Sequence, residues 1–130
     1  MKKENTKYIG IDIGGAHIKC VGIDEFKNIS YTKYESYQIW NDKKVLLEKL
    51  NQINKEVNNN KLTYGITMSA ELCDNFPNRK RGVKYIIEAC NSLKSKKLFY
   101  SNKSLLFSSK SKIEHLMSMN WHAIGKLCEN

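Results

Sequence analysis

The sequence predicts an α/β domain in which helices cover both faces of a mixed β-sheet. Three apolar and aromatic runs of strand length open the chain, and helical and strand-like runs alternate after them. The length of 130 residues, of which 41% are hydrophobic, is ordinary for one soluble globular domain. We therefore expect a single domain with a modest core.

The first three runs predict an antiparallel meander. Residues 8–13 form a β-branched and aromatic run, and residues 18–23 resume an apolar run after a turn at Gly14 and Gly15. Residues 29–39 have the aromatic content of a third strand.

A helix and a short strand are expected next. Asp42 can cap the helix, and the asparagine run at residues 58–60 ends it. Its apolar positions recur at helical spacing: Leu46, Leu50, Ile53 and Val57. Residues 62–68 then read as a short apolar strand.

The remaining sequence alternates between helix and strand. Residues 78–94 predict a second helix with one apolar face: Val83, Ile86, Cys90 and Leu93. Residues 98–100 and 105–107 suggest a strand and a short return, and residues 111–127 predict a last helix. That helix carries one stripe: Ile113, Leu116, Asn120, Ile124 and Leu127. The order β-β-β-α-β-α-β-(β)-α is the plan of a ribonuclease H-like fold.

The glycine turn is the first candidate site. In an open sheet, ligands gather beyond the carboxyl ends of the parallel strands, so Asp12 and the segment after Met68 should open together. The amides of Gly14 and Gly15 can cradle an anion, and Asp12 can hold Mg²⁺ directly or through water. The alternative is an ordinary hairpin with a solvated Asp12.

Residues 67–83 form the second candidate site, because polar chemistry is concentrated there between a strand and a helix. Glu71 and Asp74 can act as a base or as outer-shell metal ligands. The basic residues Arg79, Lys80 and Arg81 fall in the first helical turn, where they oppose the helix dipole. A bound anion would relieve that conflict.

A purely structural interpretation of residues 67–83 stays open. Asn75 or Asn78 can cap the helix, and Pro77 can stiffen the segment that enters it. The basic side chains would then be solvated.

Composition restricts the class of protein. The net charge of +9 comes mostly from Lys, which supplies 20 of the 22 basic residues, so nucleic acid is not the expected partner although anionic substrates would be attracted. The four cysteines form no C-x-x-C pair, which argues against a zinc site and a secreted disulfide framework. No apolar run reaches the roughly 20 residues that span a bilayer, and no signal peptide is evident. We expect a cytoplasmic protein that does not associate with membranes.

Both candidate segments, together with Asn120-Trp121, give the chain a family resemblance. Ile9-Gly-Ile-Asp-Ile-Gly-Gly-Ala-His-Ile-Lys19 and Thr67-Met-Ser-Ala-Glu-Leu-Cys-Asp-Asn-Phe76 resemble the hydantoinase/oxoprolinase-related proteins of the tetrahydromethanopterin-linked C1 transfer pathway. Archaeal members of that family build the methanofuran core. The resemblance implies the actin-like ATPase superfamily, in which two ribonuclease H-like lobes enclose a phosphate cleft.

The resemblance also implies a reaction and roles for residues. A furanylmethyl group would pass from its diphosphate to a phenolic hydroxyl, and diphosphate would leave. Asp12 would position Mg²⁺, Glu71 or Asp74 would take the phenol proton, and use of ATP is possible. The phosphates would be held by Gly14, Gly15, Lys19 and Arg79, and the substrate cleft would include His17, Asn75 and Asn120.

One departure from the family concerns its second lobe. Family members are longer and carry a second phosphate loop of the Asp-x-Gly-Ser-Thr-Thr kind, which this sequence lacks. We therefore expect residues 1–130 to form one ribonuclease H-like lobe. The second lobe would come from a separate polypeptide or be lost, and a lone lobe would expose apolar surface that favours a homodimer. A binding lobe without catalysis is an alternative.

A metal-dependent nuclease is the other alternative. Asp12, Glu48 and Asp74 could gather on a ribonuclease H-like sheet as a two-metal nuclease requires. The glycine turn is not needed by such an enzyme, and the helical spacing places Glu48 away from the Leu46 and Leu50 face.

Overall fold

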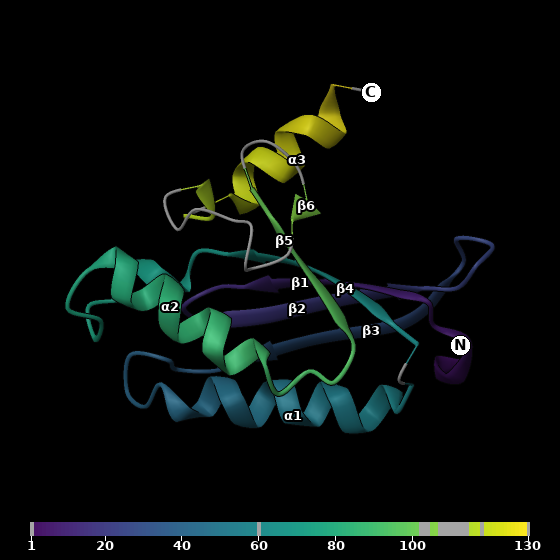
Figure 1. Cartoon of the computed structure of the whole chain (residues 1–130), viewed down its shortest axis with the longest axis horizontal. Helices are drawn as coiled ribbons and strands as arrows, with labels where there is room; N and C mark the ends of the chain where they lie inside the picture. The colour runs from purple at the N-terminus through teal and green to yellow at the C-terminus, as the bar shows by residue number, and fades with distance from the viewer. Residues whose placement is uncertain (1, 60, 102–104, 107–114, 118, 130) are drawn as a thin grey trace.

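A computed structural model describes residues 2–59, 61–101, 105–106, 115–117 and 119–129. It has an α/β fold built on a mixed sheet with the strand order β3-β2-β1-β4-β5-β6 (Figure 1). The strands are β1 (Tyr8–Ile13), β2 (His17–Ile23), β3 (Ile29–Ser36), β4 (Thr63–Met68), β5 (Lys96–Tyr100) and β6 (Leu105–Leu106).

The sheet combines an antiparallel meander with two parallel strands. β1, β2 and β3 pair antiparallel, as the glycine turn and the aromatic third run predict. β4 pairs parallel with β1, and β5 pairs parallel with β4, so their carboxyl ends lie at one edge. β6 pairs antiparallel with β5.

Helices α1 (Lys44–Val57) and α2 (Arg79–Cys90) lie together on one face of the sheet, and α3 (Asn120–Cys128) lies on the other (Figure 1). The apolar stripe of α1 is fully buried because its spacing matches the helical period: Leu46, Leu50, Ile53 and Val57. In β1 the alternation is equally clear, since Ile9, Ile11 and Ile13 are buried whereas Tyr8 is exposed. The main core therefore lies between the sheet and the pair α1 and α2.

Capping residues fix the two core helices. The Asp42 carboxylate accepts from the Lys44 amide at 2.9 Å, one residue before the cap position of α1. The sequence left Asn75 and Asn78 open as the cap of α2, and the structure selects Asn78, whose side chain accepts from the Arg81 amide at 3.0 Å.

Several predicted boundaries differ. Two 3-10 helices, η1 (Lys3–Asn5) and η2 (Ala70–Leu72), are absent from the predicted order, and β3 ends at Ser36 rather than at residue 39. The second helix ends at Cys90 rather than at 94, and α3 begins at Asn120. Residues 111–114 and 118 of the predicted last helix, and residue 107 of the predicted strand before it, lie outside the described residues. The described helices include none long and apolar enough to cross a membrane.

Candidate functional site

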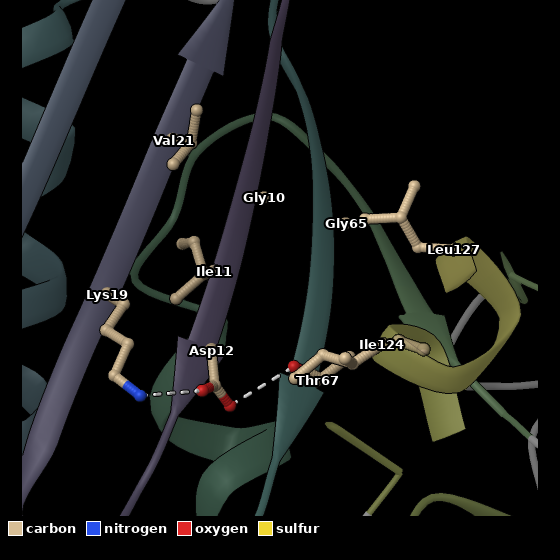
Figure 2. A pocket seen from close by; sticks show the side chains of 10 residues that line it. Gly10, Ile11, Asp12, Lys19, Val21, Gly65, Thr67, Ile124 and Leu127 are labelled. Carbon is tan, nitrogen blue, oxygen red and sulfur yellow. Dashed lines mark hydrogen bonds and ion pairs between the residues drawn. The ribbon is translucent and has the colours of Figure 1, made fainter. Parts of the chain in front are cut away.

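A groove of about 480 Å³ lies on the sheet face opposite α1 and α2. Strands β1, β2 and β4 form its floor, and α3 forms one wall (Figure 2). Its charged end holds Asp12 and Lys19, and its apolar wall includes Ile124 and Leu127. The groove thus combines an ionic end with an apolar surface.

Asp12 is held between two neighbours that the strand register places beside it. It lies opposite Lys19 on β2 and beside Thr67 on β4. Lys19 Nζ lies 3.6 Å from Asp12 Oδ2, and Thr67 Oγ1 donates to Asp12 Oδ1 at 3.3 Å (Figure 2). The Asp12 side chain is 27% exposed and Lys19 is 54% exposed, so a ligand can reach both.

Gly14 and Gly15 of the turn leave no room for a side chain, because neighbouring atoms approach their backbone closely. No glycine among the described residues has a positive φ, so a left-handed backbone is not the reason for Gly14 or Gly15. A Cβ on Gly15 would come within 2.6 Å of Cys73 Sγ, and one on Gly14 within 3.0 Å of the His17 carbonyl oxygen. The turn therefore packs directly against the second candidate segment.

Hydrogen bonds tie this turn to its surroundings. The Gly14 amide donates to the His17 carbonyl at 3.0 Å, and the Tyr37 hydroxyl donates to the Gly14 carbonyl. The Gly14 amide is thus engaged within the turn, and anion binding by the two glycine amides stays a prediction. The Ser69 amide donates to the Ile13 carbonyl at 2.9 Å, which joins the two segments.

Glu71 lies beneath the first turn of α2. Its side chain is only 1% exposed, and a Cβ on Gly82 would meet the Glu71 Cα at 2.8 Å. Asp74 and Arg79 are exposed instead. Neither carboxylate of this segment lines the groove, so the structure does not bring Glu71 or Asp74 together with Asp12 there.

Three further predicted residues lie outside the groove lining. His17 stacks on Tyr34 with ring centroids 5.2 Å apart. Asn75 donates its side-chain amide to the Ile39 carbonyl at 2.6 Å, which holds the loop after η2 in place. Asn120 is the first residue of α3 and is half-buried. These contacts are structural, and the cleft role of each residue remains a prediction.

The cysteines are free thiols with different surroundings. Burial raises the pKa of Cys20 and of Cys90 to about 12, so both stay protonated at neutral pH. Burial also raises the pKa of Cys73, and the nearby carboxylates of Asp74 and Glu71 raise it further. Such thiols are poor nucleophiles, and Cys73 serves here as the packing partner of Gly15.

A metal at this site would rely on Asp12. The described residues contain no group of three or more His, Cys, Asp or Glu side chains that could hold a metal ion. Mg²⁺ commonly keeps several waters and uses one or two carboxylates plus substrate phosphates, so a single accessible carboxylate fits it. The three-carboxylate nuclease arrangement is not formed, because Glu48 lies exposed on α1, on the other side of the sheet from the groove.

Comparison with known proteins gives one informative relationship. No protein-family model matches the chain. Over 123 residues it is 31% identical to (4-{4-[2-(γ-L-glutamylamino)ethyl]phenoxymethyl}furan-2-yl)methanamine synthase of Methanocaldococcus jannaschii. The chain is a distant relative of this synthase. The match covers 91% of the chain but only 35% of the synthase, so it spans about a third of that enzyme's length.

The structure adds groove residues that sequence reasoning did not assign to the site. Thr67 reaches Asp12 because β1 and β4 pair in register, and the sequence separates the two by 55 positions. The alternation along β4 could have indicated that Thr67 shares a face with Gly65. The predicted stripe of the last helix contains Ile124 and Leu127, but helical spacing alone does not indicate that they face this groove.

Proposed function

We propose that the chain is the N-terminal, ribonuclease H-like lobe of a transferase in methanofuran and tetrahydromethanopterin-linked C1 cofactor biosynthesis. In this proposal a furanylmethyl diphosphate is joined to a phenolic acceptor and diphosphate is released. The distant relation to the M. jannaschii synthase supports the reaction class. The observation that supports this choice of site is the arrangement of Asp12, Lys19 and Thr67 at the end of an otherwise apolar groove.

The charges of this arrangement suit a departing diphosphate. Lys19 offers an accessible ammonium group, and the Thr67 hydroxyl orients the Asp12 carboxylate. Bound Mg²⁺ would neutralise charge that develops on the leaving diphosphate. Asp12 would hold that ion, Lys19 would release Asp12 and contact a phosphate oxygen, and Gly15 and Arg79 would complete the anion contacts.

The acceptor must lose a proton as its oxygen attacks the methylene carbon. The new C–O bond forms from the phenolic oxygen, and the bond between the methylene carbon and the diphosphate oxygen breaks. Glu71 and Asp74 both lie outside the groove lining, and of the two Asp74 is the better candidate base because it is exposed, whereas Glu71 is buried beneath α2. ATP would occupy the same phosphate contacts if the lobe binds it.

A second lobe would complete the enzyme in this proposal. The chain matches about a third of the related synthase, and its groove is open on one face of the sheet. Tyr8, Val21 and Tyr34 are exposed large side chains. All three lie on the face that holds Asp12 and Lys19, as the strand registers show. The second lobe would cover this surface.

Product formation tests the proposal. The chain is incubated with Mg²⁺, a furanylmethyl diphosphate and a phenol that bears a γ-glutamylaminoethyl chain, alone and with a candidate second-lobe polypeptide. The aryl ether and free diphosphate should appear in equal amounts and only when Asp12 is intact. Tight binding of the diphosphate without ether formation under either condition would favour a non-catalytic binding lobe.

A further inference from the structure

The groove continues along β1 and β4 in the direction away from its charged end. A second hollow of about 270 Å³ adjoins it and is lined by Tyr8 and Leu98. Both hollows share Gly10 and Gly65, so these glycines lie where the two meet. A ligand anchored at Asp12 would therefore extend over the glycines.

The shared floor is flat because two glycines lie side by side on neighbouring strands. Gly10 and Gly65 are register partners in the β1 and β4 pair. Glycine weakens a strand interior and often marks a close approach by a ligand or another backbone. A Cβ on Gly10 would meet nothing nearer than the Val21 carbonyl oxygen at 3.9 Å, so packing within the described chain does not exclude a side chain there.

Apolar side chains border this floor. Ile124 and Leu127 project from α3 and remain 63% and 75% exposed, although both line the groove (Figure 2). Val21 lies on β2, at the other side of β1 from Gly65. Exposed aliphatic side chains on opposite sides of a flat backbone surface suit a planar apolar group.

We infer that Gly10 and Gly65 form the floor of a subsite for the planar ring of an arylmethyl or heteroarylmethyl diphosphate, between Val21 and the Ile124 and Leu127 wall. The choice of diphosphate as the anchoring group rests on the proposed function. Charge complementarity supports it through Lys19 and the Mg²⁺ that Asp12 would hold, because both residues stand at the one ionic end of the groove that the described residues form. Gly10 and Leu127 are therefore specificity-determining residues.

Two ligands separate ring binding from phosphate binding. Calorimetry with Mg²⁺ compares inorganic diphosphate with benzyl diphosphate, and we expect the benzyl ester to bind about tenfold more tightly to the wild type. Gly10→Val fills the floor and should abolish that preference, while affinity for inorganic diphosphate stays within about twofold. Leu127→Ala, at an exposed position, should reduce the preference about threefold. Thr32→Val places a similar side chain opposite Val21 on β3, outside the groove, and should change neither affinity.

Loss of affinity for both ligands in folded Gly10→Val, or an unchanged benzyl preference in Gly10→Val and Leu127→Ala, would overturn the inference. A wild type that binds no inorganic diphosphate would instead overturn the proposed function. In that case the ring subsite is tested separately, by titrating the chain with benzyl alcohol and following its backbone amide resonances by NMR. Chemical-shift changes of the Gly65 and Ile124 amides in the wild type that are lost in Gly10→Val would uphold the subsite. The absence of such changes in the wild type would overturn it.

Discussion

Gly15 packs so closely against Cys73 that a Cβ at position 15 would lie 2.6 Å from the Cys73 sulfur. These residues come from the two segments that carry the candidate chemistry, the glycine turn and the segment after β4. The Ser69 amide reinforces the contact through its bond to the Ile13 carbonyl. The loops at the carboxyl ends of β1 and β4 are thereby fixed relative to each other.

Gly15→Ala should destabilise the chain by about 1–3 kcal/mol, because the new methyl group overpacks the contact with Cys73. Urea denaturation measures the change. Cys73→Ala in the same chain should restore most of the loss, since it removes the sulfur. Gly125→Ala is the matched control: nothing lies within 4 Å of its Cβ, and the helical substitution should stabilise by about 0.5–1 kcal/mol. Full destabilisation that Cys73→Ala does not relieve would refute the contact.

Thr67 should act as a positioning residue for Asp12. Thr67→Val keeps the shape but removes the donor, so affinity for Mg²⁺-diphosphate should fall about threefold to tenfold. Thr67→Ser retains the hydroxyl and should recover most of the affinity. Calorimetry at constant ionic strength compares the three chains. Equal affinities for the Val and Ser variants would show that the hydroxyl is not needed.

Low pH should weaken the ion pairs that connect β3 to α1. Hydrogen bonds from Lys49 and then Lys33 hold the pKa of Glu35 below its usual 4.5, and Lys33 also donates to Glu56 at 2.8 Å. A lowered carboxylate pKa means that the stabilisation is complete above about pH 4.5 and is lost as the pH falls through the folded-state pKa.

The free energy of unfolding should therefore decrease from about pH 5 to pH 3, with a smaller slope in Glu35→Gln than in the wild type. At neutral pH the same variant should be less stable by about 1–2 kcal/mol, because Lys49 and Lys33 each lose an ionic partner. Denaturant titrations across this pH range test both points. Parallel pH profiles for the two chains would argue against a contribution from Glu35.

Local patterns predicted much of the fold. Alternation in residues 8–13 and the helical stripe of α1 report burial directly, because each has one face on the core. The sequence narrowed the cap of α2 to Asn75 or Asn78, because each precedes the helical run, and only the structure selects Asn78. The end of β3 at Ser36 was not predictable in this way, because residues 37 and 39 remain apolar and buried after strand pairing stops.

The candidate site was predictable only in part. Asp12 and the turn could be found from sequence because they are contiguous, and Lys19 follows within the same hairpin. Thr67, Gly65 and Leu127 join Asp12 only through strand pairing and the packing of α3, which local periodicity does not encode. Burial of Glu71 also depends on tertiary structure, because α2 approaches it at Gly82.

The binding of Mg²⁺-diphosphate by Asp12 is the central claim, and isothermal titration tests it most directly. Wild type should bind diphosphate only with Mg²⁺, and Asp12→Asn should lose at least about tenfold in affinity. Asp42→Asn removes an equal charge but keeps a capping side chain before α1, so its affinity should stay within about twofold of the wild type. Wild-type affinity in Asp12→Asn, or binding that does not require Mg²⁺, would contradict the account.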